Sequence, residues 1–177
     1  MKILKSILLV IVVLIAIVLI AALFVKKEYS VEREIIINKP NEDVFNYVKH
    51  LKNQDKYNKW VMMDPNVRRN YSGTDGTVGF VSTWDSDNKN VGKGEQEIKK
   101  INEGERIDLD VRFEKPFKNT ANVYMTTEAI SANQTKVKWG MQGKNSYPLN
   151  LMNLFVPGIL GKDLQTSLTT LKMVLEN

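Results

Sequence analysis

The chain has 177 residues and carries 25 Lys and Arg, 20 Asp and Glu, one His and no Cys. The lack of cysteine excludes disulfides, thiolate nucleophiles and cysteine-based zinc sites, and a single histidine excludes metal sites that need two His ligands. Four basic residues flank an apolar N-terminal segment and the other 21 face all 20 acids, so the formal charge of +5 does not indicate the clustered basic surface that nucleic acid requires.

The apolar segment runs from Ile7 to Val25 without a charge or a strongly polar group. As a helix it would be about 28 Å long, close to the ~30 Å hydrocarbon core of a bilayer. Lysines bracket it on both sides, namely Lys2, Lys5, Lys26 and Lys27. We therefore predict one transmembrane helix, an anchor over residues 1–27 and a globular domain over 28–177.

A retained anchor is favoured over a cleaved signal peptide. The apolar core is longer than the 7–15 residues of a signal, and it ends at Lys26 and Lys27 without a small-x-small cleavage site. The short basic tail before Ile7 favours a domain outside the cytoplasm, whereas Lys26 and Lys27 favour the opposite orientation. We expect a single-pass membrane protein and give preference to an extracytoplasmic domain.

The domain begins with a predicted strand over Tyr29–Asn38, followed by two short helices. Pro40 suits a helix start because its missing N–H would have no partner there. The first helix then has one apolar face, formed by Val44, Phe45, Val48 and Leu51. A second short helix is predicted around Gln54–Trp60.

The middle of the chain has the texture of antiparallel strands separated by turns. In Arg106–Lys115, apolar residues alternate with charged ones, which is typical of a sheet with one buried and one wet face. Asp75–Gly76 is a strong hairpin signal between the first two of these strands. The predicted strands are Val67–Tyr71, Thr77–Trp84, Val91–Ile101, Arg106–Lys115, Thr120–Ile130 and Thr135–Gly143.

The chain ends in a predicted amphipathic helix over Gly161–Glu176. Leucines recur on one stripe at i, i+4, i+7 and i+11, namely Leu164, Leu168, Leu171 and Leu175. An apolar segment, Leu149–Val156, precedes it and is interrupted by Pro157–Gly158.

This order of elements resembles the helix-grip fold of the START-like (SRPBCC) superfamily, the polyketide cyclase/dehydrase and lipid-transport group, from Tyr29 to the C-terminus. The residues that carry the resemblance are Val31-Glu32-Arg33, Pro40-x-Glu42-x-Val44-Phe45, Trp60, Asp64-Pro65, Tyr71-Ser72-Gly73, Val91-Gly92-x-Gly94, Lys115-Pro116-Phe117, Trp139-x-Met141 and Gly161-Lys162-Asp163-Leu164. They look like the membrane-anchored bacterial subgroup. The resemblance implies an α+β domain whose antiparallel sheet of about seven strands wraps around the C-terminal helix and leaves a cavity for an apolar ligand.

Inward-facing residues of the predicted sheet and helix are the candidates for lining such a cavity, although interiors are usually filled by side chains. Gln96 shares a face with Gly94 and Ile98, so it would need a buried partner. Gly92 and Gly94 either bend that strand or leave room for a ligand. The candidate cavity residues are Trp60, Phe80, Trp84, Gln96, Phe113, Trp139, Met141, Leu164 and Leu168.

Catalytic and metal motifs are lacking. His50 lies near the end of the first predicted helix, where a histidine usually caps the helix or lies in solvent. Asp85-x-Asp87-Asn88 lacks the Gly and Glu of a calcium loop. We predict no catalytic residue, metal site or cofactor.

Three functions remain open at this point. The first is a membrane-tethered protein that binds a lipid or another apolar small molecule. The second is a cyclase, dehydratase or hydrolase acting on an apolar substrate, and the third is a ligand-free module that docks a protein partner. An open apolar cavity would favour the first, a convergent polar cluster the second and a packed interior the third.

Overall fold

The computed structural model describes residues 2–177, with side chains from residue 3 onward. An N-terminal helix, α1 (Lys2–Phe24), precedes β1 (Glu28–Ile37) and the short helices α2 (Asn41–Val48), η1 (Leu51–Lys56) and α3 (Lys59–Met62). Six strands follow: β2 (Arg68–Ser72), β3 (Val81–Asp85), β4 (Lys93–Asn102), β5 (Arg106–Lys115), β6 (Asn119–Ser131) and β7 (Gln134–Lys144). The chain ends with η2 (Leu149–Leu154) and α4 (Val156–Glu176).

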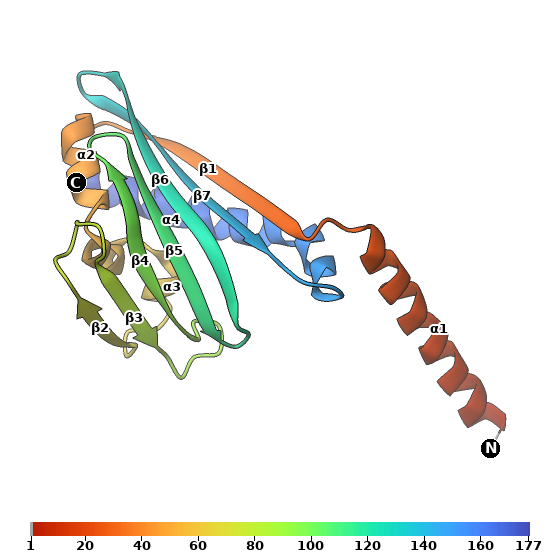
Figure 1. The fold of residues 1–177 in the computed structure, drawn as a ribbon. Coiled ribbons are helices and arrows are strands. Elements are labelled where there is room, and N and C mark those ends of the chain that lie inside the picture. Colours follow the sequence, from red (N-terminus) through yellow and green to blue (C-terminus); the bar gives the residue numbers. More distant parts are fainter. Residues whose placement is uncertain (1) are drawn as a thin grey trace.

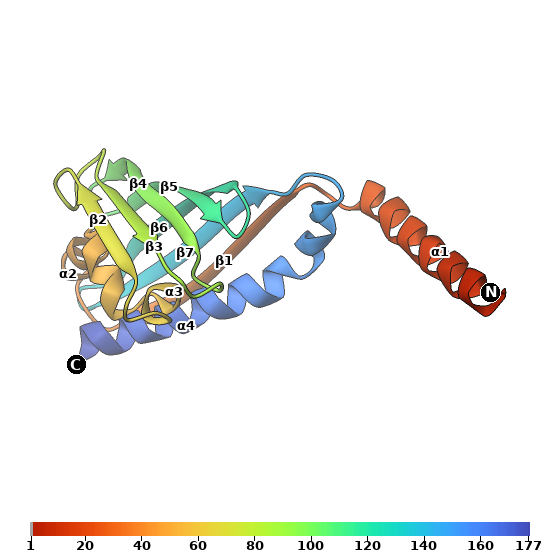
Figure 2. The ribbon, with the colours of Figure 1, turned by 90° about the horizontal axis from the view of Figure 1, so that it is seen from below.

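The seven strands form one antiparallel sheet in the order β1-β7-β6-β5-β4-β3-β2. The first and last strands of the chain are neighbours, with Val31 opposite Met141 and Arg33 opposite Trp139. The sheet curves around α4, and α2 lies at the end where α4 finishes (Figures 1 and 2). Helix α3 packs against the middle of α4, where Lys59 contacts Asp163 and Ser167. This is the predicted helix-grip arrangement, and both the fold class and the two short helices after the first strand are confirmed.

The core lies between the concave face of the sheet and α4. Ile107 and Leu109 of β5 are buried, as the alternation of that strand predicts. On α4, Leu164, Leu168 and Leu171 are completely buried against the sheet. Each Å² of apolar surface removed from water stabilises the folded state by about 25 cal/mol. The burial of this leucine face therefore determines which side of α4 packs on the sheet.

One predicted strand is shorter in the structure. Thr77–Trp84 was expected to be extended, but β3 begins only at Val81. Gly76 and Gly79 have φ angles of +80° and +87°, a left-handed backbone that interrupts an extended chain. The amide of Phe80 donates to the carbonyl of Thr77, which closes a turn immediately before the strand.

Two helix boundaries also differ. The predicted Gln54–Trp60 helix is divided into η1 and α3, because the side chain of Asn58 accepts from the amide of Trp60 and starts a new helix there. The C-terminal helix begins at Val156, five residues before the predicted Gly161. Pro157 does not interrupt it, because proline in the first helical turn costs no hydrogen bond.

The N-terminal helix extends away from the sheet and the other helices (Figures 1 and 2). Its segment Ile3–Phe24 is the one helix among residues 2–177 that is long and apolar enough to cross a membrane, judged by length and composition. Its large apolar side chains are exposed over almost the whole length. Which side of a membrane the domain would face stays a prediction.

Candidate ligand cavity

A cavity of about 290 Å³ lies inside the grip, between the concave face of the sheet and helices α3 and α4. Seven of the nine candidate residues line it, namely Trp60, Trp84, Gln96, Phe113, Trp139, Met141 and Leu164. The other two lie outside this lining. Phe80 and Leu168 are completely buried in the packed part of the core.

Two aromatic pairs form much of the wall. The rings of Trp84 and Phe113 meet edge to face with their centroids 6.0 Å apart, and those of Trp60 and Trp139 with centroids 6.4 Å apart. Edge-to-face contacts of this kind are favourable for aromatic rings and hold their orientation. Both pairs connect different elements, so the wall is shaped by the tertiary fold.

Gly94 explains how Trp84 reaches this wall. A Cβ atom at Gly94 would lie 2.7 Å from the ring of Trp84 and 2.4 Å from the carbonyl oxygen of Arg112. The missing side chain therefore gives space to the indole ring, whose Nε1 donates to the carbonyl of Val91 at 3.2 Å. The glycine thus gives room to an aromatic wall residue, and the β4–β5 register also shifts between Lys93 and Gly94, so the strand is irregular at the same point.

Part of the cavity surface is polar. Three amide side chains form a hydrogen-bonded group there. Oε1 of Gln54 accepts from Nδ2 of Asn58 and from Nε2 of Gln96, at 3.1 Å in each case. Gln54 and Asn58 are buried, as is Ser82, which is opposite Gln96 in the β3–β4 register. The partner that Gln96 was expected to need is thus Gln54.

Some polar atoms of this group are left for a ligand. Within residues 2–177, Nε2 of Gln54, Oε1 of Gln96 and the hydroxyl of Ser82 make no side-chain hydrogen bond with the protein. All three residues line the cavity. These atoms face the cavity, so they suit a ligand with its own hydrogen-bonding group, or a water.

The helix α3 covers one side of the cavity and is fixed to α4. The amide of Lys59 donates to the hydroxyl of Ser167 at 3.0 Å, and the Lys59 ammonium pairs with Asp163. These contacts place Trp60, the next residue, over the cavity. The contacts of Lys59, the first residue of α3, therefore hold this helix over the cavity.

The charged residues of the cavity lining are Arg69 and Lys115. The guanidinium of Arg69 pairs with the carboxylate of Asp55. His50 lies outside the lining, with its Nδ1 3.7 Å from a carboxylate oxygen of Asp75. Over residues 2–177, no group of three or more His, Asp or Glu side chains could hold a metal ion.

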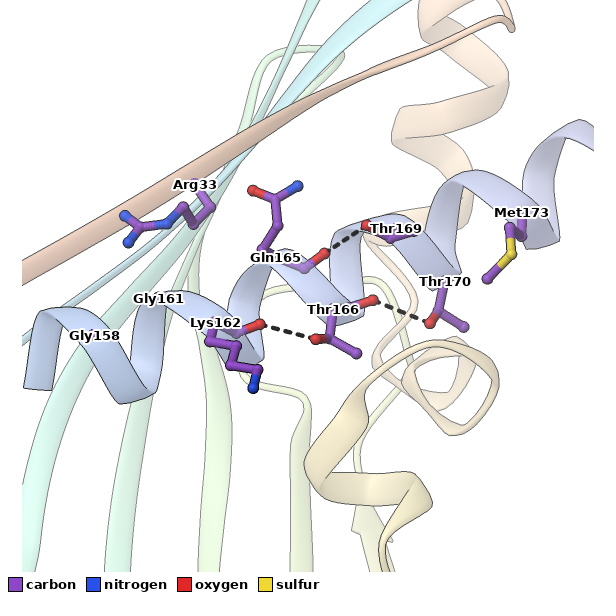
Figure 3. A pocket seen from close by; sticks show the side chains of 9 residues that line it. All are labelled: Arg33, Gly158, Gly161, Lys162, Gln165, Thr166, Thr169, Thr170 and Met173. Carbon is purple, nitrogen blue, oxygen red and sulfur yellow. Dashed lines mark hydrogen bonds between the residues drawn. The ribbon is translucent and has the colours of Figure 1, made fainter.

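A second, more open groove of about 510 Å³ lies on the solvent side of α4 (Figure 3). Its threonine hydroxyls donate to backbone carbonyls one turn earlier, for example Thr166 to Lys162 and Thr170 to Thr166, at 2.9 and 3.0 Å. Arg33 of β1 reaches over Gly161 and donates to the carbonyl of Pro157 at 3.2 Å. These groups already have partners in the protein, so the interior cavity is the better candidate site.

The fold and the cavity together define a helix-grip domain with an interior cavity lined mostly by apolar side chains. The chain belongs to the polyketide cyclase / dehydrase and lipid transport family, whose model matches residues 28–176. No curated protein matches the sequence.

Solved structures with the same fold are distant in sequence. A truncated norcoclaurine synthase from Thalictrum flavum has a TM-score of 0.65 at 11% identity, covering 86% of this chain and 98% of that one. A protein from Thermobifida fusca has a TM-score of 0.64 at 14% identity, covering 82% and 92%. The Aha1 dimer from Colwellia psychrerythraea has a TM-score of 0.57 at 15% identity, covering 83% and 96%. At these identities the likeness concerns the fold alone.

Proposed function

We propose that this protein is a membrane-tethered binding protein that holds a lipid or another apolar small molecule in the cavity between the sheet and α4. The observation that carries the proposal is the unfilled cavity of about 290 Å³ beside the buried hydrophobic core of the domain. Ligand sites in proteins are concave, mostly apolar and carry a few placed polar groups, which is the composition of this lining.

The lining also restricts the chemistry of the ligand. The volume is near the lower end of the roughly 300–1,000 Å³ range of ligand pockets, so it suits a compact molecule or one part of a lipid. The aromatic wall favours an apolar body, and the free amide and hydroxyl atoms of Gln54, Gln96 and Ser82 favour an uncharged hydroxyl, carbonyl or amide at one end. A ligand with an apolar body and such a polar end would bond to these cavity-facing atoms and remove apolar surface from water.

The tether in this proposal is the helix over Ile7–Val25 within residues 1–27. It has the length of a membrane span, and its side chains are exposed in the structure as those of a lipid-facing helix would be. A membrane is also a source of apolar molecules, so the tether would keep the cavity next to its supply.

The cavity favours binding over the other two functions considered from the sequence. A domain that only docks a protein partner has no need for an interior space. General acid–base catalysis needs a titratable side chain within reach of the substrate, and in the described lining Lys115 is the one candidate, with no carboxylate or imidazole to act with it. Norcoclaurine synthase, solved with dopamine and hydroxybenzaldehyde, shows that a protein of this fold can bind small aromatic molecules.

Filling the cavity tests the proposal. Val111 lines it from β5, so Val111→Trp should occupy the space and weaken the uptake of a fluorescent fatty acid by about tenfold or more, because apolar contact worth about 25 cal/mol per Å² is lost. Thr120→Trp, on the exposed face of β6, is the matched control and should bind normally. Native mass spectrometry of gently purified protein should show a bound molecule in the unmodified chain. Protein that is always empty and takes up no fatty acid would refute the binding function.

A further inference from the structure

At the junction between α1 and the domain, two asparagines bind the end of the helix and the residues that follow it. Nδ2 of Asn150 donates to the carbonyls of Ala22 and Val25, at 2.6 and 2.7 Å. Nδ2 of Asn153 donates to the carbonyls of Lys26 and Lys27, at 2.9 and 2.8 Å. The last carbonyls of a helix have no partner within it, so these contacts satisfy groups that would otherwise be costly in a lipid environment.

Further hydrogen bonds connect Asn153 and the residues after α1 to the sheet. Nδ2 of Asn145 donates to Oδ1 of Asn153 at 2.7 Å, and Nδ2 of Asn119 donates to Oδ1 of Asn145 at 3.1 Å. The amide of Asn145 donates to the carbonyl of Lys27 at 2.9 Å. The end of α1 is therefore attached to η2 and to the sheet, so the position of η2 relative to α1 is fixed.

The opposite side of the same segment is apolar and exposed. While Asn150 and Asn153 point to α1, the neighbouring side chains of η2 and of the first turn of α4 are more than half exposed. These are Leu149, Met152, Leu154, Phe155 and Ile159, which we call the η2 surface. No charged residue occurs between Lys144 and Lys162, so the surface is uncharged and has a lysine at each end.

A further exposed aromatic residue lies at this end of the sheet. The register places the start of β1, the end of β7, the start of β6 and the end of β5 side by side. Phe117, in the turn between β5 and β6, is exposed there. The cavity extends to the same end, since its lining includes Pro116 and Leu160, the neighbours in sequence of Phe117 and Ile159.

We propose that the η2 surface is a second membrane contact, which lies in the interfacial layer of the bilayer next to the end of α1. The inference rests on the proposed membrane tether and deepens it, because it turns a domain suspended from a helix into one docked on the lipid surface. Three observations support a lipid surface as the occupant: the fixed attachment to α1, the uncharged apolar side chains, and the flanking lysines that suit anionic headgroups. Docking also places the end of the cavity nearest α1 against the bilayer.

The absence of cysteine in the chain allows a direct test by single-cysteine labelling of the full-length protein. Phe155→Cys and Ile159→Cys, each labelled with an environment-sensitive fluorophore, are reconstituted in vesicles of phosphatidylcholine with a minority of phosphatidylglycerol. Met173→Cys is the matched control, because it is exposed on the same helix near its other end. Ile15→Cys, in the middle of α1, reports on the tether itself.

We expect spin-labelled lipid to quench the labels at 155 and 159 and aqueous iodide to leave them bright, with the reverse at 173. If label 15 is quenched by lipid while labels 155 and 159 respond to iodide as strongly as label 173, the docking inference is wrong and the tether stands. If label 15 is not quenched by lipid, the tether is wrong and the docking inference falls with it. Circular dichroism of each labelled variant verifies that it is folded.

Discussion

Tyr57 lies behind the aromatic wall of the cavity and is completely buried. Its ring meets that of Trp139 edge to face, with the centroids 5.9 Å apart. Its hydroxyl donates only to the sulfur of Met125, at a long 3.9 Å. Burial, with smaller contributions from Tyr47 and Asp75, raises the pKa of the Tyr57 hydroxyl far above its usual value of 10.0. The folded protein therefore keeps this proton in alkaline solution.

This pKa shift predicts a loss of stability in alkali. Above about pH 10 the unfolded chain releases the Tyr57 proton that the folded chain retains, so the stabilisation is complete below that pH and decreases as the pH rises. Tyr57→Phe should change the free energy of unfolding by less than about 1 kcal/mol at neutral pH, because it removes only a weak hydrogen bond. Between neutral pH and about pH 11, the free energy of unfolding of Tyr57→Phe should fall by about 1.4 kcal/mol less than that of the unmodified protein.

Chemical denaturation at the two pH values, followed by tryptophan fluorescence, measures this difference. Tyr71→Phe is the control because Tyr71 is partly exposed and its stacking on Phe80 is kept. Equal alkaline losses in Tyr57→Phe and in the unmodified protein would contradict the assignment to Tyr57.

At the scale of elements, hydrogen bonds from η2 hold the segment that connects α1 to the domain. Asn150 is completely buried and supplies both donors for the carbonyls of Ala22 and Val25. Its removal leaves two carbonyls without a protein donor, which costs about 1–3 kcal/mol where water is excluded. The segment containing Lys26 and Lys27 would then open more often.

Trypsin reports on that opening, because it cleaves after lysine. In Asn150→Ala, cleavage after Lys26 or Lys27 should become about fivefold faster or more, since 1 kcal/mol changes an opening equilibrium by about that factor. Asn66→Ala, at an exposed position far from the junction, should be cleaved at the original rate. Mass spectrometry of the released domain measures both rates, and unchanged cleavage in Asn150→Ala would show that its hydrogen bonds do not hold the junction.

At the scale of the whole molecule, the domain contains its own core. Ala22 is the one residue of α1 among the described buried apolar residues, and the other members come from β1 to α4. The central cluster on which the fold depends does not include α1. We therefore expect α1 to contribute little to the stability of the domain.

A chain of residues 28–177 should accordingly fold alone. We expect one cooperative thermal transition with a Tm within about 5 °C of the full-length protein in the same detergent, because only the junction contacts are lost. Circular dichroism at increasing temperature measures this. A truncated chain without a cooperative transition would show that α1 is part of the folding unit.

The sequence predicted the architecture because its signals are local and repeated. The alternation in β5 and the leucine stripe of α4 each identify a buried face without knowledge of the partner element. Phe80 keeps the inward face of Ser82 and Trp84, because its carbonyl accepts from the amide of Ile98 across β4. Its ring is nevertheless buried in the core and stacks on Tyr71, outside the cavity lining, and the local pattern does not indicate where the cavity ends.

Residues whose role depends on distant partners could not be found in this way. Gln54 occurs in an irregular short helix, and its function at the cavity follows from Gln96, which is remote in sequence. Leu164 and Leu168 belong to one stripe, yet only Leu164 lines the cavity, because the space is confined to one part of the curved sheet. Asn150 and Asn153 sit in an apolar segment where asparagine has no obvious purpose until the end of α1 is placed beside them.

The short passage from α1 to β1 has a consequence for any exchange of cargo. Only three residues, 25–27, separate the two elements, and even fully extended they would span about 10 Å. A domain on such a stalk would not be able to swing toward a second membrane or carry its ligand through the aqueous phase. Transfer of the ligand would then depend on acceptor molecules that diffuse to the domain within the same bilayer. The protein would store its ligand at one membrane and would not carry it to another.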